Sequence, residues 1–518
     1  MSAKVLTSLL ILIIMMYGCA DDESKVSKYT DFDTLLESIN ASNTQKLLIE
    51  DTTFSSDIMA DYVFDFEYET TQIDEETFES IRGNRGTSAM ERDLDTNKII
   101  EDIEILFYLL RNVYVGYGYF GGDTVFNNAK ENILKEIKLF EEEMKSLGVE
   151  DGKIRRYGLQ RIVKIIGENL SFIDKDAHFF IDGYGYFVKE EILYYNDDLE
   201  VLQDNKGYYF YEDEVKKYIN LINNDKEIEK HLKLTITNEG NLVYMLGYVL
   251  PAQPDVPIIR EIVLDVTDEN NKQNNEITLR LKTPTMTEYN KYNNIPFIMD
   301  FDKNPPVLKV NNFDNPEFSP VKDDFFDTAV DLRNEEIFII DLRGNSGGSS
   351  LFGQQWLKNY TNGEFDKEEL DLFHIGMAGE SYKQLLEIPY ELETENGWIL
   401  YIGNNTRKEL IKNENLIFVL IDESIASASE NFVGVLQVLE NVILVGRNTG
   451  GYTHIGNTIA MFLPYTEIEL SYGMTAFTKA PPFGVEEGIG IMPDIWIGDS
   501  TNLAAKLDKF ITNIKNNR

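Results

Sequence analysis

The chain is poor in cysteine, in basic residues and in long apolar segments. Its 518 residues include one cysteine, Cys19, so no disulfide can form within the chain and stability must come from packing. Only 48 Lys and Arg stand against 89 Asp and Glu, which gives a formal charge of −41 and argues against a nucleic-acid partner and against adsorption to anionic lipid. Beyond the N-terminal segment no run is apolar enough to cross a bilayer. With 43% hydrophobic residues, the composition indicates a globular protein with a sizeable core.

Residues 1–19 predict an export signal. One Lys is followed by a short apolar run, then by Gly18-Cys19 and an acidic polar stretch. A lone Cys after a small residue resembles the lipobox of bacterial lipoproteins, which implies a diacylated Cys19 as the new N-terminus and a lipid anchor in the cell envelope, on the periplasmic side or the cell surface. A plain secretory signal with an incidental Cys is the alternative. Residues 20–98 are acidic and polar, and predict a tether with poorly defined structure.

Two segments of different periodicity come next. Over residues 99–185 the apolar residues recur at helical spacing, which predicts a small helical domain. Residues 186–295 are rich in strand patterns, and "REIVLDV" and "EITLRLKT" flank a polar turn as the two strands of a hairpin should. We therefore expect an embedded β-rich domain here; a PDZ-like domain is possible, although the usual glycine-rich PDZ motif is not visible.

The hydrophobic pattern of the sequence changes again over residues 296–518. Four continuous apolar runs, "IFIIDL", "WILYIG", "LIFVLI" and "VILVG", alternate in part with helical stretches. Such runs are typical of strands buried on both faces, so this segment predicts an α/β core with crossover helices.

Three loops that follow apolar runs could carry chemistry. "LRGNSGGSS" holds Gly347 and Gly348, which let the backbone turn its amides outward and could receive an oxyanion. "DESIASASENF" places three serines at a strand-to-helix corner, where a serine is more often a simple helix cap. "RNTGGYTHIGN" adds a glycine turn with His454, one of only four histidines in the chain. Neither a nucleotide-binding pattern nor a metal-ligand cluster is visible.

Four motifs in this order, "IIDLRGNSGG", "VLIDESIASASENFVGVLQ", "ILVGRNTGG" and "EEGIGIMPDI", resemble the tail-specific (C-terminal processing) serine peptidase family. Within that family, "TGGYTH" resembles the branch that includes tricorn core peptidases and the interphotoreceptor retinoid-binding protein-like peptidases. The resemblance implies an α/β fold with a ClpP/crotonase-like spiral of ββα units. It also implies Ser427 as nucleophile, with an oxyanion hole formed by the amides of Ala428 and of the Gly347-Gly348 turn. No cofactor is implied.

The base departs from the simple Ser-Lys dyad of processing peptidases. The lysine of that dyad lies 25 residues after the serine, where this chain has Tyr452. The tricorn-like branch uses a histidine from the segment before the core, and the matching position in "DKDAHFF" is His178. Glu487 corresponds to the carboxylate that supports this histidine. The alternatives are His454, Lys479, and a core histidine at position 178 with no catalytic role.

The leading hypothesis is thus an extracytoplasmic serine endopeptidase that acts on peptides or proteins. A catalytically inactive peptidase-fold lipoprotein with a binding or scaffold role is the alternative, motivated by the missing lysine. An acyl-CoA enzyme of the crotonase type is a third possibility, but it needs a basic phosphate site for which this acidic chain offers little support. Neither substrate specificity nor oligomeric state follows from the sequence.

Overall fold

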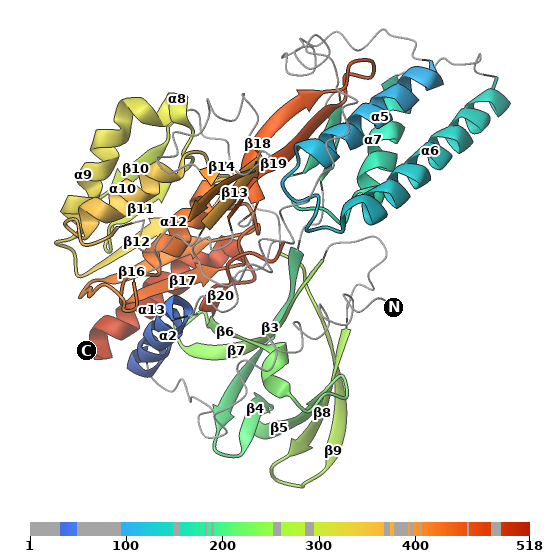
Figure 1. The fold of residues 1–518 in the computed structure, drawn as a ribbon. Coiled ribbons are helices and arrows are strands. Elements are labelled where there is room, and N and C mark those ends of the chain that lie inside the picture. The colour runs from blue at the N-terminus through green and yellow to red at the C-terminus, as the bar shows by residue number, and fades with distance from the viewer. Residues whose placement is uncertain are drawn as a thin grey trace.

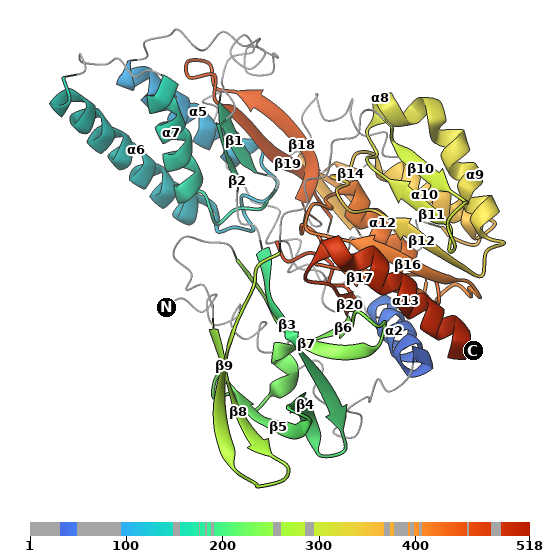
Figure 2. The same cartoon turned by 180° about the vertical axis from the view of Figure 1, so that it is seen from behind.

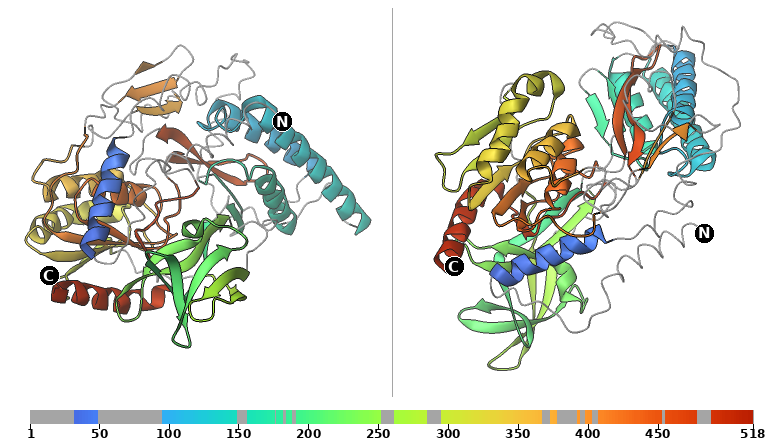
Figure 3. Two further views of the ribbon diagram at one scale, coloured as in Figure 1. Left: turned by 90° about the horizontal axis from the view of Figure 1, so that it is seen from below. Right: turned by 60° about the vertical axis from the view of Figure 1, so that its left-hand side comes forward.

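The computed structural model describes residues 32–48, 95–148, 156–175, 177–181, 184–187, 191–251, 261–284, 295–366, 373–377, 392–393, 398–402, 407–452, 455–477 and 488–517. Three sheets and their helices form a helical unit, a parallel-sheet core and a β-rich unit, which lie at three corners of the molecule (Figures 1 and 3). Among the described residues no helix is long and apolar enough to span a membrane.

The core is a six-stranded sheet in the order β10-β11-β12-β16-β17-β20. All neighbours are parallel except β10 and β11. The bounds are β10 (Phe297–Asp300), β11 (Val307–Val310), β12 (Ile337–Asp341), β16 (Leu416–Ile421), β17 (Val442–Gly446) and β20 (Ile495–Trp496). Three of the four predicted apolar runs are therefore central strands of one parallel sheet, as expected.

The two faces of this sheet are covered by different helices. Alternate residues of each central strand, such as Phe338 and Ile339, point into separate apolar clusters, because successive side chains of a strand point to opposite faces. One face packs against α9 (Lys322–Leu332), α10 (Ser350–Tyr360) and α12 (Ala428–Leu436), and α8 (Asn315–Phe318) lies beside them. The other face packs against α2 (Phe32–Leu47) and α13 (Leu503–Asn517), which lie side by side in Figure 2.

Helix α2 lies within the segment that the sequence predicts to be a tether. Its apolar residues Leu35, Leu36 and Ile39 are buried against β16, β17 and α13. Asn40 donates to Asn441 Oδ1 at 3.2 Å and accepts from the Asn441 amide at 2.9 Å. This helix therefore belongs to the parallel-sheet core, although more than 200 residues of other units separate it in sequence from the rest of that core.

A second sheet, of seven strands, joins the helical unit to the core. Its order is β14-β15-β13-β19-β1-β2, with β18 paired to β19. The bounds are β14 (Leu392–Glu393), β15 (Trp398–Ile402), β13 (Phe373–Met377), β19 (Glu469–Phe477), β1 (His178–Ile181), β2 (Tyr184–Phe187) and β18 (Ile455–Phe462). "WILYIG" is β15 in this antiparallel sheet, so its predicted place in the parallel core was wrong; an apolar run alone does not specify which sheet a strand joins.

The helical unit consists of α5 (Thr96–Asn112), α6 (Gly122–Ser146) and α7 (Arg156–Asn169). Gly148 follows the end of α6 and has φ +80°, a conformation that glycine adopts without strain. The three helices share one apolar cluster with β1, β18 and β19. Buried Asp102 of α5 strengthens this contact by accepting hydrogen bonds from the amides of Tyr465 and Thr466. Strand β1 is thus held between the helices and the C-terminal hairpin.

The β-rich unit is a seven-stranded antiparallel sheet in the order β6-β7-β3-β4-β5-β8-β9. The bounds are β6 (Leu232–Ile236), β7 (Leu242–Pro251), β3 (Glu191–Asp204), β4 (Gly207–Glu212), β5 (Val215–Ile222), β8 (Glu261–Asp268) and β9 (Asn274–Arg280). The predicted hairpin is β8-β9, with Ile262, Leu264 and Val266 inside. The unit contacts the core through β20, where Trp496 packs with Tyr195 and Met245.

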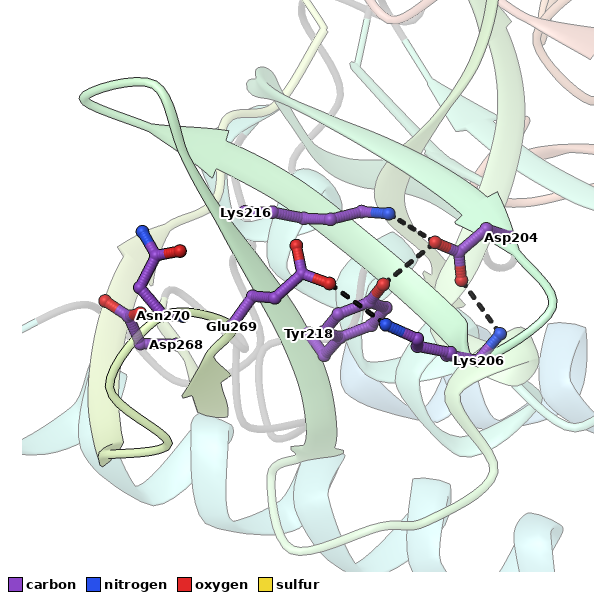
Figure 4. Close-up of polar contacts among 7 residues, drawn as sticks. All are labelled: Asp204, Lys206, Lys216, Tyr218, Asp268, Glu269 and Asn270. Carbon is purple, nitrogen blue, oxygen red and sulfur yellow. Dashed lines mark hydrogen bonds and ion pairs between the residues drawn. The ribbon is translucent and has the colours of Figure 1, made fainter.

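A group of charged residues lies at one end of the β-rich unit (Figure 4). Asp204 accepts hydrogen bonds from Lys216 and from the Tyr218 hydroxyl, and Lys206 pairs with Glu269 at 3.0 Å. These opposite charges pair with one another near the surface, and the pairs join neighbouring strands. Each such pair contributes little to the stability of the fold.

Candidate active site

Ser427 lies at a sharp corner between a buried strand and a helix. Strand β16 ends at Ile421, and α12 begins at Ala428, directly after the serine. Ser427 has φ 53° and ψ −119°, a backbone conformation that costs a non-glycine residue about 1–3 kcal/mol and that is concentrated at functional sites. The serine is therefore held at the corner by its surroundings, and its conformation is similar to that of the nucleophile at the strained strand-to-helix turn of α/β-hydrolases.

The glycine-rich loop after β12 packs directly against this corner. A Cβ atom on Gly347 would lie 2.9 Å from the Ala426 carbonyl oxygen, 3.1 Å from Ser427 Cβ and 3.2 Å from the Ala428 nitrogen. Only a residue without a side chain permits so close an approach, because Gly347 also has φ +108°. The structure thus places the glycine-rich loop after β12 against the loop that holds Ser427, and the sequence analysis singles out both loops.

The amides near Ser427 differ in their availability. The Gly347 amide donates to Oδ1 of the fully buried Asn345 at 3.0 Å. The Ala428 amide is the first of its helix and has no intrahelical partner. Among the described residues the Gly348 amide makes no hydrogen bond. Of the three amides expected for an oxyanion hole, those of Ala428 and Gly348 are therefore the better donors.

Glu430 is a site residue that the sequence analysis did not single out. Its side chain is fully buried, and its carboxylate accepts hydrogen bonds from the amides of Ser427 at 3.2 Å, Gly451 at 2.7 Å and Tyr452 at 2.8 Å, and from the Thr449 hydroxyl. Burial raises the pKa of Glu430, while these hydrogen bonds oppose that shift. One carboxylate therefore joins the serine corner to the glycine turn that follows β17.

That glycine turn also contacts the loop that leads into β20. The Gly450 amide donates to the Ile425 carbonyl at 2.8 Å, and the Gly488 amide donates to the Gly451 carbonyl at 2.9 Å. Glu487 directly precedes Gly488 but lies outside the described residues, as do His454 and Lys479. The described backbone thus places Gly488, the residue that follows Glu487 in the sequence, against the turn at Gly451.

His178 begins strand β1 and lies opposite Ser471 of β19. Its side chain is half-buried, and burial lowers its pKa, while hydrogen bonds with the backbone of Ala177 and Lys175 oppose the shift. A histidine with a lowered pKa is neutral at physiological pH, so one ring nitrogen can accept a proton. His178 therefore has the protonation state that a general base requires.

The buried carboxyl group of Asp422 connects the loop after β12 with the loop after β16. Asp422 Oδ1 accepts from the amides of Gly344 at 3.3 Å and Ser424 at 3.1 Å, whereas Oδ2 has no hydrogen-bond partner among the described residues. Burial, and then the charge of Glu423, raise the pKa of Asp422 to about 7. The ionised form of this side chain is accordingly disfavoured in the folded state.

Replacing Asp422 by asparagine should stabilise the protein more at high pH than at low pH. Because the folded-state pKa lies above the ordinary value of 3.8, the folded state binds the proton more tightly, and wild-type stability falls as pH rises from about 4 to about 7. Asparagine keeps the acceptor oxygen and does not titrate. Its unfolding free energy relative to wild type should rise by about 2 kcal/mol between pH 5 and pH 7 in urea denaturation. A difference independent of pH would contradict this assignment.

A serine at a strained strand-to-helix corner, with free amides beside it and a glycine loop packed on it, defines a serine hydrolase site. The family comparison agrees, since residues 307–497 match the model of peptidase family S41. This range includes strands β11, β12, β16, β17 and β20 and the Ser427 corner. The match covers 191 of the 518 residues of the chain, and it identifies this part as a serine peptidase domain similar to family S41.

Solved structures similar to this chain include three proteases. Mature CPAF has 14% sequence identity and a TM-score of 0.38, with 81% of this chain and 96% of that chain covered. The photosystem II D1 C-terminal processing protease has 13% identity and a TM-score of 0.33, with 80% and 96% covered. The tricorn protease has 12% identity and a TM-score of 0.33, with 80% and 35% covered. A comparison with curated proteins gave no significant match.

Proposed function

We propose that this chain is an exported serine endopeptidase in which Ser427 forms an acyl-enzyme with a peptide or protein substrate. The observation that carries the proposal is the strained conformation of Ser427 at the corner, with the Gly347 loop packed against it. Such strain is retained where the surrounding structure needs one residue at a fixed place.

In the proposed mechanism, Ser427 Oγ attacks the substrate carbonyl carbon while His178 accepts the hydroxyl proton. The amides of Ala428 and Gly348 stabilise the oxyanion of the tetrahedral intermediate. Collapse of this intermediate breaks the peptide bond, and His178 returns the proton to the leaving amine. Water, deprotonated by the same histidine, then attacks the acyl-enzyme carbonyl carbon. The ester bond to Ser427 Oγ breaks, His178 returns the proton to that oxygen, and the second product leaves. In this proposal Glu487 supports the imidazolium that forms on His178.

The proposal extends to where the protein works. Residues 1–19 would act as a lipoprotein signal, and a lipid on Cys19 would anchor the enzyme in the bacterial envelope, on the periplasmic side or the cell surface. The support is the sequence pattern alone, since these residues lie outside the described part of the chain.

Labelling with a fluorophosphonate probe tests the proposed site. We expect one covalent adduct per chain, which peptide mass mapping places on Ser427, and no adduct on heat-denatured protein. Ser424→Ala is the matched control, because Ser424 lies in the same loop and should leave labelling unchanged. An adduct on Ser424 or Ser429 would show that the nucleophile is misassigned. Absence of any adduct would instead favour the binding or scaffold role.

A further inference from the structure

Lys175 is a buried lysine beside the candidate active site with no role in the mechanism above. It lies three residues before His178, and only 5% of its surface is exposed. A lysine is rarely buried to this extent unless its amine has a hydrogen-bond partner. The contacts of this side chain therefore indicate what it does.

The amine of Lys175 reaches the glycine turn after β17. Nζ donates to the Gly450 carbonyl oxygen at 2.7 Å, and it lies 5.9 Å from the centroid of the Tyr452 ring. Farther back along the side chain, Cε lies 4.0 Å from the position that a Cβ on Gly488 would occupy. The lysine thus contacts both the turn at Gly450 and the loop that follows Glu487.

The backbone of the same residue contacts the proposed base. His178 makes hydrogen bonds with the backbone of Lys175 and Ala177, and these bonds act against the effect of burial on the pKa of the histidine. Contacts of this kind restrain the orientation of an imidazole ring. Lys175 consequently contacts His178 through its main chain and the Gly450 turn through its side chain.

From Gly450 the contacts continue to the nucleophile. The Gly450 amide donates to the Ile425 carbonyl at 2.8 Å, two residues before Ser427. The next two amides of the turn donate to Glu430, which in turn accepts from the Ser427 amide. A continuous series of hydrogen bonds therefore leads from the backbone beside His178 to the backbone of Ser427.

We propose that Lys175 is a positioning residue that fixes His178 relative to Ser427 by anchoring the segment before β1 to the Gly450 turn. This inference rests on the proposed function, because it takes Ser427 as nucleophile and His178 as base. Lys175 acts through His178 and does not itself exchange a proton with the substrate. Ser427 follows β16 of the core sheet, whereas His178 begins β1 of the second sheet, and the two residues lie about 250 positions apart in the sequence. Their relative position therefore depends on a contact between these two parts of the fold.

The test is the rate constant of fluorophosphonate labelling as a function of pH, in the full-length protein. Lys175→Met keeps the apolar stem and removes the amine, and it should slow labelling about 10- to 100-fold. The inflection that His178 produces in the pH profile should move up toward the ordinary histidine value of about 6.5, because the ring is no longer held in its buried position. Lys164→Met is the control, since Lys164 is a partly exposed residue of α7, paired with Glu168 at 3.5 Å, and should change neither quantity.

A double-mutant cycle separates this inference from the proposed function. If Lys175 acts through His178, Lys175→Met should slow labelling less than about twofold in a His178→Ala background. Equal slowing in both backgrounds, or a wild-type rate for Lys175→Met alone, would overturn the inference while Ser427→Ala still abolishes labelling. Wild-type labelling by His178→Ala would instead refute the proposed base. Should Lys175→Met fail to fold, Lys175→Arg, which keeps a donor for Gly450, should label within about tenfold of wild type and slow only where His178 is present.

Discussion

Ser427→Ala is expected to lower kcat for peptide hydrolysis by at least about 10⁴-fold, because no acyl-enzyme can form without the hydroxyl. KM should change little, since the oxyanion amides and the rest of the site remain. Stability should also stay close to wild type, because alanine keeps the Cβ and the same backbone conformation. The measurement is hydrolysis of a fluorogenic peptide or of unfolded casein, with urea denaturation as a check on folding.

Ser429→Ala provides a matched control for that experiment. Ser429 lies in the same short segment and is fully buried, and its hydroxyl has no hydrogen-bond partner among the described residues. Removing an unsatisfied buried hydroxyl should leave activity unchanged and stability equal or slightly higher. If Ser429→Ala lost activity to the same extent as Ser427→Ala, the assignment of the nucleophile would be wrong.

Glu430→Ala is expected to have the second largest effect, on both stability and labelling. The substitution leaves the amides of Ser427, Gly451 and Tyr452 and the Thr449 hydroxyl without their acceptor in a buried site. The unfolding free energy should fall by about 3–5 kcal/mol, because each buried donor left without an acceptor costs about 1–3 kcal/mol and only some of them can find new partners. Labelling of Ser427 should slow by at least about 100-fold, because the corner and the Gly450 turn are no longer held together.

Glu430→Gln separates the acceptor role of this side chain from its shape. Glutamine retains one acceptor oxygen and the same volume, but its NH₂ group must face two of the donors that the carboxylate served. Its stability and labelling rate should therefore lie between those of wild type and Glu430→Ala. Wild-type behaviour of Glu430→Ala in both urea denaturation and labelling would refute the role of Glu430 as the connection between the two loops.

Local sequence patterns were sufficient to predict much of the parallel-sheet core. Continuous apolar runs at "IFIIDL", "LIFVLI" and "VILVG" predict strands buried on both faces, and each became a central strand because its position between helices leaves no exposed face. The corner at Ser427 was likewise predictable from a strand pattern followed directly by a helical one. The elements that were missed depend on partners distant in sequence.

Helix α2 shows why such elements are hard to predict. Its sequence, "FDTLLESINASNTQKL", has few apolar residues and several Ser, Thr and Asn, which favour helices weakly. It becomes a helix in the fold because its few apolar side chains enter a cluster built by β16, β17 and α13. Asn40 also makes two hydrogen bonds with Asn441, the residue directly before β17. Tertiary contacts of this kind leave no periodic signal in a short window of sequence.

The residues of the candidate site also fall into those that the sequence could predict and those that it could not. The pair of Ser427 and Glu430 is spaced as a helix capping box, so a role for Glu430 at the corner could have been inferred from its position alone. Lys175 could not, since its partner at Gly450 is 275 residues away. The sequence has Tyr452 where a dyad lysine is expected. Only the fold shows that the amine of Lys175 lies over the Tyr452 ring.

The position of α2 also determines the order in which the protein can be completed during synthesis. Asn40 meets Asn441 across 401 residues, and α13, the other helix on that face, ends at Asn517. At about 5–20 residues per second, a ribosome needs roughly 20–80 s to make the chain between those two asparagines. Throughout that interval the apolar side chains of α2 have no native surface to cover them. Helix α2, the first helix in the described part of the chain, is thus among the last to be buried, and the nascent chain must be protected from aggregation until its C-terminal residues have emerged.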